Sequence, residues 1–198
     1  MPRMKNYKVS KATKSYVKKA LAAETELKHF ATAETAISIG STGTTRINLV
    51  QIAQGDGYQN RDGNQIKVKK ITLNWRMNHS GSASIPTHAR LLIVRNKDQV
   101  ADYQPNYADV MASASALSTR NPITGNRYAI VYDKDVICDT YHPLVRGSVT
   151  LKMNTDVRFN GTIGDDVEKN GYTLIFISNQ VLYTPTFTYT WHTSFTDA

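Results

Sequence analysis

The sequence contains little of what disulfide-stabilised, metal-centred or membrane proteins depend on. Its single cysteine, Cys138, cannot form a disulfide within the chain, which favours synthesis in a reducing compartment. Its five histidines never stand two or four positions apart, so no histidine pair with metal-ligand spacing exists. No apolar run approaches the roughly 18 residues that a membrane-spanning helix needs, and no apolar segment follows the basic N-terminus as in a secretory signal.

Motifs for catalysis are also missing. The chain has no G-x-S-x-G element around a nucleophilic serine, and no histidine partner for Cys138 can be identified. Gly55-Asp56-Gly57 is not followed by the glycine pattern and helix of a nucleotide-binding loop. Neighbouring acids such as Asp165 and Asp166 are typical of turns. We therefore expect no catalytic residues and no enzymatic activity.

Acidic residues are absent from the first nineteen positions. These positions carry seven basic residues: Arg3, Lys5, Lys8, Lys11, Lys14, Lys18 and Lys19. The rest of the chain carries the other seventeen of the 24 basic residues and all 16 acids, so a charge of +7 out of +8 lies in this segment. Contacts between cations and phosphates release counterions, so these seven residues are predicted to bind nucleic acid without reading its sequence. The alternative is a solvated tail with no dedicated partner.

Part of this basic segment has the pattern of an amphipathic helix. Ser10 is a suitable N-cap, and Lys11, Lys14 and Lys18 recur at helical spacing. Apolar residues recur on roughly the opposite side: Tyr16, Ala20, Ala23, Leu27 and Phe30. This stripe is too narrow and too rich in alanine to bind a membrane strongly. We expect it to pack against a partner helix or the underside of the body.

The remaining residues have the pattern of one all-β domain. Short β-prone runs predict strands at Ala36–Ile39, Arg46–Ile52, Ile66–Met77, His88–Arg95, Tyr128–Ile137, Val145–Met153, Tyr172–Ser178 and Thr184–Phe195. Apolar residues change parity at Lys69-Lys70, which predicts a β-bulge. In the last run, Phe187, Tyr189 and Trp191 share one face, as in a half-buried antiparallel strand.

These runs predict an overall architecture. The one other helical pattern spans Asn106–Leu117, and strands do not alternate with helices as in a parallel sheet. We therefore expect an arm of residues 1–30 and a single domain of residues 31–198, folded as an eight-stranded antiparallel jelly roll of two sheets.

The polar loop of residues 54–64 is a candidate cation site. Asp56 and Asp62 bracket a turn rich in carbonyls, and Ca²⁺ prefers carboxylate and carbonyl oxygens. The order of the acids does not match an EF-hand, and ordinary Asx-turns are the alternative reading.

Several segments resemble the satellite tobacco necrosis virus coat protein family and the related capsid proteins of small circular Rep-encoding single-stranded DNA viruses. The landmarks, in order, are Phe30-Ala31 after the basic helix, Gln54-Gly55-Asp56-x-x-x-Asn60-Arg61-x-Gly63-x-Gln65, Asn121-Pro122-Ile123-Thr124, Arg127-Tyr128-x-Ile130 before Asp133, and Thr196-Asp197-Ala198. They cover essentially the whole chain.

The resemblance implies a jelly-roll capsid subunit that self-assembles into a T=1 icosahedral shell of about 60 copies and holds single-stranded nucleic acid with its arm. It implies a place in the virion, synthesis in the host cytoplasm, an option of nuclear import and no membrane partner. The arm is rich in lysine where the DNA virus capsids are rich in arginine, so RNA and DNA genomes both stay open.

The resemblance also implies Ca²⁺ between subunits. The matching positions are Asp56, the backbone carbonyls of Asp62 and Gln65, and Asp197, with Asp62 standing where the family has serine.

The alternative function for the whole chain is a soluble jelly-roll module that binds carbohydrate or nucleic acid and forms no shell.

Overall fold

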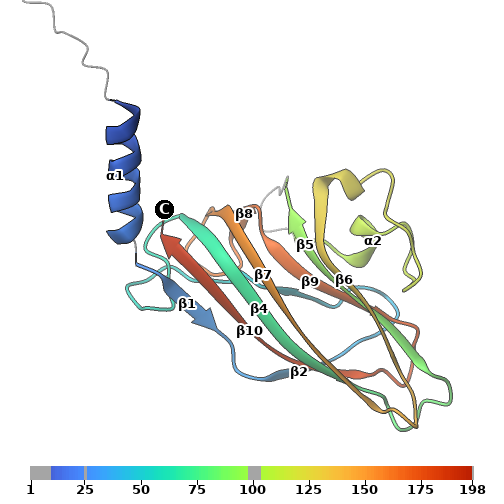
Figure 1. Cartoon of the computed structure of the whole chain (residues 1–198). Coiled ribbons are helices and arrows are strands. Elements are labelled where there is room, and N and C mark those ends of the chain that lie inside the picture. Colours follow the sequence, from blue (N-terminus) through green and yellow to red (C-terminus); the bar gives the residue numbers. More distant parts are fainter. Residues whose placement is uncertain (1–9, 25, 98–103, 198) are drawn as a thin grey trace, which may run out of the picture.

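The computed structural model describes residues 10–24, 26–97 and 104–197, and consists of a β-sandwich with a helix at one end (Figure 1). None of the helices among these residues is long and apolar enough to cross a bilayer. In chain order the elements are α1 (Lys11–Glu24), β1 (Lys28–Ala31), β2 (Thr35–Ser38), β3 (Arg46–Asn48), β4 (Gln65–Asn78), β5 (Thr87–Asn96), α2 (Tyr107–Val110), β6 (Tyr128–Cys138), β7 (Leu144–Phe159), β8 (Val167–Lys169), β9 (Tyr172–Ser178) and β10 (Thr186–Asp197).

The two sheets have the topology of a jelly roll. One sheet has the order β1-β10-β4-β7-β8, with β2 also paired to β10, and the other has the order β3-β9-β5-β6, all antiparallel. Strands β1 and β2 pair with successive parts of β10, so they act as one interrupted strand, and β8 is a three-residue addition beside β7. With β1 and β2 counted as one strand and β8 set aside, eight strands remain, and their arrangement confirms the predicted all-β jelly roll.

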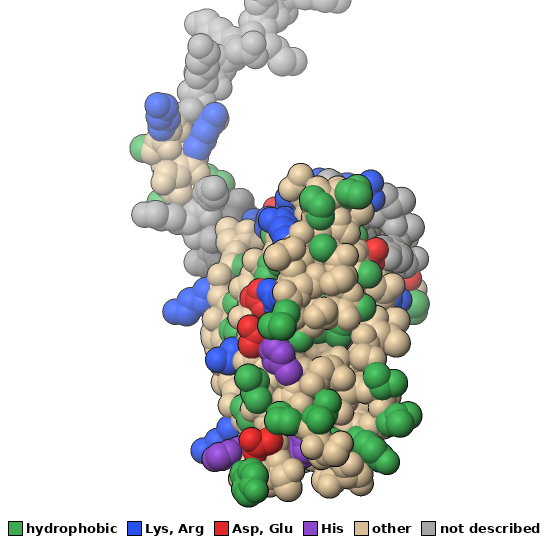
Figure 2. Space-filling model, turned by 90° about the vertical axis from the view of Figure 1, so that its right-hand side faces the viewer, with side chains coloured by type: hydrophobic (Ala, Val, Ile, Leu, Met, Phe, Trp, Pro, Cys, Tyr) green, Lys and Arg blue, Asp and Glu red, His purple; other side chains and the backbone are tan. Residues whose placement is uncertain are grey.

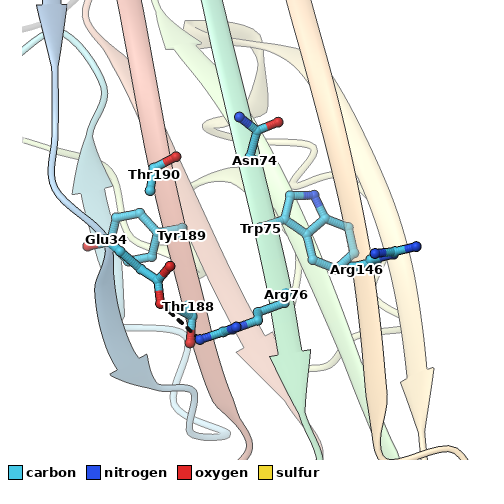
Figure 3. A pocket seen from close by; sticks show the side chains of 8 residues that line it. All are labelled: Glu34, Asn74, Trp75, Arg76, Arg146, Thr188, Tyr189 and Thr190. Carbon is cyan, nitrogen blue, oxygen red and sulfur yellow. Dashed lines mark hydrogen bonds and ion pairs between the residues drawn. The ribbon is translucent and has the colours of Figure 1, made fainter.

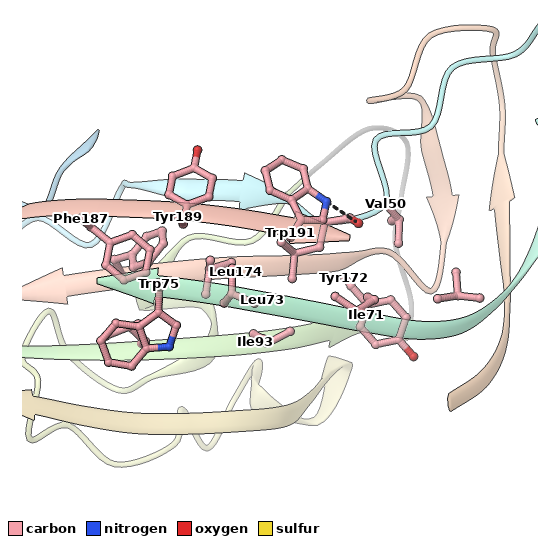
Figure 4. Packing of buried hydrophobic residues seen from close by; sticks show 14 of the residues in the cluster. Val50, Ile71, Leu73, Trp75, Ile93, Tyr172, Leu174, Phe187, Tyr189 and Trp191 are labelled. Carbon is pink, nitrogen blue, oxygen red and sulfur yellow. Dashed lines mark hydrogen bonds between the residues drawn. The ribbon is translucent and has the colours of Figure 1, made fainter. Parts of the chain in front are cut away.

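Aromatic residues of β4 and β10 form the centre of the core between the sheets. Trp75, Phe187, Tyr189 and Trp191 follow one another with ring centroids 5.7–5.8 Å apart (Figure 4). The buried Trp191 indole Nε1 donates a hydrogen bond of 3.1 Å to the carbonyl of Leu49, which satisfies its one polar atom. The predicted sharing of one face by Phe187, Tyr189 and Trp191 is confirmed.

The outer faces of the two sheets differ. Tyr107, Val110 and Met111 cover the outer face of the four-stranded sheet and pack with buried residues of β5 and β9 such as Leu92 and Ile175. The outer face of the six-stranded sheet instead presents polar side chains at alternate positions of β4 and β7. An amphipathic strand pattern of this kind leaves one sheet face available to solvent or a partner.

Two helix predictions were wrong at their ends. The predicted helix over Asn106–Leu117 is four residues long, because Met111 adopts an extended conformation and pairs with Arg120. Burial of Met111 therefore outweighs the helix propensity of the alanines that follow. Helix α1 ends at Glu24, and Phe30 lies in β1, where its ring contacts Trp191 at 6.2 Å between centroids. The sheet thus begins at Lys28, inside the range predicted for the arm.

The strand predictions differ mainly at their ends. Strand β7 continues six residues beyond the predicted Met153, and β3 stops at Asn48 rather than Ile52. The pairing of β4 shifts register between Val68 and Lys70, so the bulge predicted at Lys69-Lys70 is confirmed.

Candidate nucleic-acid interface and subunit contacts

Helix α1 presents part of the basic arm. The backbone N–H of Thr13 donates to Ser10 Oγ at 3.1 Å, so Ser10 is the N-cap that the sequence predicts. Lys11 and Lys14 are exposed in the first turns, and Lys18 and Lys19 belong to the same helix. The other predicted contacts, Arg3, Lys5 and Lys8, lie outside the described residues.

The apolar side of α1 does not pack on the body in its described part. Tyr16 is 74% exposed and Val17 is also exposed. The expectation of packing against the underside of the body was therefore wrong for Tyr16, whereas Phe30 of the same predicted stripe packs on the body from β1. A partner helix stays a prediction.

Lys28 ties the start of the sheet to the loop of residues 54–64 and to the chain's last strand. Its side chain is buried, and Nζ lies 2.6 Å from Asp62 Oδ1 and 2.9 Å from Asp197 Oδ2. Burial lowers the pKa of this ammonium, but the hydrogen bonds to Asp62 and Asp197 outweigh burial and leave the pKa raised. The bond from Lys28 in turn lowers the pKa of Asp62. This arrangement was not predicted.

The residues predicted to bind calcium are only partly together. Asp62 donates its backbone N–H to Asp197 Oδ1 at 3.1 Å, and its carbonyl already accepts a bond of 3.1 Å from Gln54 Nε2. Gln65 lies at the start of β4, and Asp56 is exposed in the loop. No cluster of three or more acids, histidines or cysteines suited to a metal exists within residues 10–24, 26–97 and 104–197.

Lys28 supplies the positive charge that a calcium ion would supply between Asp62 and Asp197. Within one subunit these residues therefore do not fit a calcium site, since Ca²⁺ needs six to eight oxygens and no ammonium among them. Calcium between subunits stays a prediction, and it requires Lys28 to move and a neighbouring copy to provide oxygens.

Arg61 shapes this loop from inside. Its guanidinium is fully buried, lies 4.0 Å above the centre of the Phe159 ring, and donates to the carbonyls of Ile52, Gly63 and Gly161. Burial lowers the pKa of this guanidinium, although the group remains charged at neutral pH. The arginine of the sequence motif thus holds the backbone around Asp62 rather than facing a ligand.

Exposed apolar side chains gather at the end of the sandwich farthest from α1. There the loops between β4 and β5, β6 and β7, and β9 and β10 lie side by side (Figure 1). We call the exposed hydrophobic residues of these loops and of the adjoining strand ends the apolar tip: Ile85, Ile137, Tyr141, Leu144, Val181, Leu182 and Tyr183. Tyr141 is 90% and Leu182 81% exposed. Figure 2 shows several hydrophobic side chains on the lower part of the molecule. Exposed hydrophobic residues that neighbouring loops bring to one end of a molecule mark a candidate interaction surface.

A basic arm, a jelly roll and an apolar tip occur here in one chain. The family model of the satellite tobacco necrosis virus coat protein matches residues 1–198. The chain belongs to the satellite tobacco necrosis virus coat protein family. As a member, it is a viral coat protein and part of the virion, and its role is structural.

Other comparisons add little to this membership. A comparison with curated proteins finds no match. A structure of infectious bursal disease virus, Gx strain, is 9% identical with a TM-score of 0.18, over 86% of this chain and 42% of that chain. T=1 particles derived from infectious bursal virus give 8% identity and a TM-score of 0.16, over 86% and 40%. The coat protein spans about two fifths of the length of these chains, and such scores carry no argument about its fold.

Proposed function

We propose that this coat protein assembles into a T=1 icosahedral shell of about 60 copies and packages single-stranded nucleic acid through its basic arm. The observation that supports packaging is the separation of charge. Seven cations precede the first acid of the chain, whereas the rest is nearly neutral. An arm of this kind binds phosphates strongly at low salt.

The geometry of α1 suits phosphate binding. Its 14 residues extend over ~21 Å, and Lys11 and Lys14 are exposed with no carboxylate within 4.0 Å among the described residues. Lysine ammonium groups act as point charges and make no bidentate contact with a base. Packaging is therefore expected to tolerate any sequence, and recombinant particles should contain host RNA.

The apolar tip supports self-assembly. Residues such as Val181 and Leu182, which are 74% and 81% exposed, leave hydrophobic area in water in a single subunit. Contact between tips of neighbouring copies around a symmetry axis would remove this area from water. A binding module that stays monomeric would leave this hydrophobic area in water, so the apolar tip favours a shell over the alternative function.

Electron microscopy of purified recombinant protein, together with the absorbance ratio at 260 and 280 nm, tests the proposal. Full-length protein should form closed particles of uniform size that contain nucleic acid. Deletion of Met1–Lys19 should leave a folded body, by circular dichroism, that packages none. A monodisperse monomer at all salt concentrations would contradict assembly, and unchanged nucleic-acid content after the deletion would contradict packaging by the arm.

A further inference from the structure

Two pairs of like charges lie directly opposite each other on the outer face of the six-stranded sheet. The antiparallel pairing of β4 with β7 places Lys70 opposite Lys152 and Arg76 opposite Arg146. Within each strand, these residues alternate with buried ones such as Ile71 and Met77, so all four side chains project from the same outer face. We call these two pairs the basic rungs.

Like charges that face each other across neighbouring strands destabilise a sheet, because their Cβ atoms are ~5 Å apart. Figure 3 shows the two arginines pointing apart, with Arg76 directed to Glu34, whose Oε1 lies 2.8 Å from its Nη2. Among the described residues, no carboxylate lies within 4.0 Å of Lys70, Lys152 or Arg146. The repulsion in the lysine rung therefore lacks compensation within the subunit, whereas Glu34 partly compensates that in the arginine rung.

The surface between the rungs is polar but carries no acid. The intervening pairs are Thr72 with Thr150 and Asn74 with Ser148, whose side-chain oxygens lie 3.3 Å and 2.7 Å apart. The rungs are six positions apart along each strand, which corresponds to ~20 Å. Hydroxyl and amide groups of this kind donate hydrogen bonds to phosphate and sugar oxygens.

A hollow of about 260 Å³ lies beside the arginine rung (Figure 3). Arg76 and Arg146 are among the residues that line it, together with the buried residues Trp75 and Tyr189. The hollow thus has two cations at an open polar surface, and cations along a groove are what proteins use to hold the backbone of a single strand without reading its sequence.

The basic rungs also affect a neighbouring histidine. His192 of β10 has a lowered pKa, caused by burial, by His29 and by the charge of Lys70. Strand β1, which continues from the arm, pairs with β10 at the edge of this same sheet. The arm thus leads into the same sheet that carries the rungs.

We propose that the basic rungs on β4 and β7 form a second binding surface for the packaged single strand, where its phosphates neutralise Lys70, Lys152, Arg76 and Arg146. This inference rests on the proposed packaging function and extends it from the arm to the body. Charge complementarity selects the occupant, since four cations and one acid on an open polar face fit a polyphosphate and give a second copy of this chain little apolar area to bury.

The salt dependence of binding to a fluorescent oligouridine tests the inference on the full-length chain. We expect Arg146→Gln/Lys152→Gln to reduce the slope of log K against log salt by ~1.4, because each lost phosphate contact on a single strand removes ~0.7. A matched control, Arg127→Gln/Lys134→Gln, removes the same charge from exposed positions next to and within β6 and should leave the slope unchanged. Lys11→Gln/Lys14→Gln tests the arm.

The outcomes separate the two proposals. An unchanged slope for Arg146→Gln/Lys152→Gln, with a reduced slope for Lys11→Gln/Lys14→Gln, would overturn the second surface and keep packaging by the arm. Unchanged slopes for both would overturn both. A second readout excludes a purely structural role. Without nucleic acid, removing the repulsion should raise the Tm of Arg146→Gln/Lys152→Gln by ~1–4 °C, whereas a lower Tm would count against the inference.

Discussion

Lys28 and Asp197 form an ion pair of 2.9 Å that joins the first residue of the first strand to the last residue of the last strand. Asp62, in a loop between them in the sequence, accepts from the same ammonium at 2.6 Å. The three side chains close the edge of the six-stranded sheet where the arm enters it. The link is electrostatic, so its contribution depends on pH.

Replacement of Lys28 by methionine should destabilise the subunit at neutral pH, because Asp62 and Asp197 lose their shared donor. The lowered pKa of Asp62 means that this stabilisation is present above ~pH 4 and is lost as the pH falls through the folded-state pKa. The raised pKa of Lys28 means that it is also lost at alkaline pH, above ~10.4.

Urea denaturation from pH 3 to pH 10 measures this difference. The gap between wild type and Lys28→Met should be flat from about pH 5 to 9 and should narrow below ~pH 4. Lys67→Met is the control, since Lys67 and Asp156 form a half-exposed pair at 3.5 Å that contributes little. A gap as large at pH 3 as at pH 7 would contradict the ion pair as its cause.

Gly147 leaves room for the Trp75 ring on the opposite strand. A Cβ at this position would lie 2.6 Å from Trp75 Cε2, so Gly147→Ala should force the ring to shift and lower stability by about 1–3 kcal/mol. In thermal unfolding this corresponds to a drop of roughly 2–12 °C. Gly81→Ala, where a Cβ would meet nothing within 4 Å, should be nearly neutral, and equal Tm values for the two variants would refute the steric argument.

The apolar tip should control assembly without controlling the fold. Leu182→Asp adds a charge to a side chain that is 81% exposed, so the Tm of the free subunit should change little. Particle yield by size-exclusion chromatography should fall at least tenfold, because an unpaired carboxylate would be buried at each contact. Ile123→Asp, at a residue that is 86% exposed but outside the tip, is the control. Normal yield from Leu182→Asp would show that the tip is not a subunit contact.

Calcium should act on particles rather than on the subunit. Lys28 already neutralises Asp62 and Asp197 within one chain, so EDTA or added Ca²⁺ should leave the Tm of the free subunit unchanged. In particles, EDTA should lower the Tm and calcium should restore it by mass action. Asp197→Asn should reproduce part of the EDTA effect. Calcium-dependent melting of the free subunit would contradict this view, and identical curves for all particle samples would reject the metal.

The long strands could be predicted because their signals are local. Alternation of buried and exposed residues gives β4 and β10, and the change of parity at Lys69-Lys70 gives the bulge. The helix ends could not be predicted, because Phe30 matches a helical spacing by coincidence and is held in β1 by pairing with Thr193. Burial of Met111 likewise outweighs the helix propensity of the alanines that follow it, and only that propensity can be recognised in the sequence.

The candidate site could likewise be predicted only in part. The arm cations are visible as a charge run, whereas the role of Lys28 depends on residues 34 and 169 positions away in the chain. The basic rungs depend on register, since a shift of one residue would place Lys70 and Lys152 out of step. The charged residues of β4 and β7 can be read from the sequence, but the pairs that face each other across the two strands cannot.

The order of strands also bears on synthesis. Strand β10 lies between β4 and the pair formed by β1 and β2, so the middle of the six-stranded sheet is the part translated after all its neighbours. Until β10 leaves the ribosome, β1 and β2 have no partner strand, and the arm has no anchored base. The six-stranded sheet can therefore be completed only after β10 has been synthesised, and a growing polypeptide cannot join a shell before then.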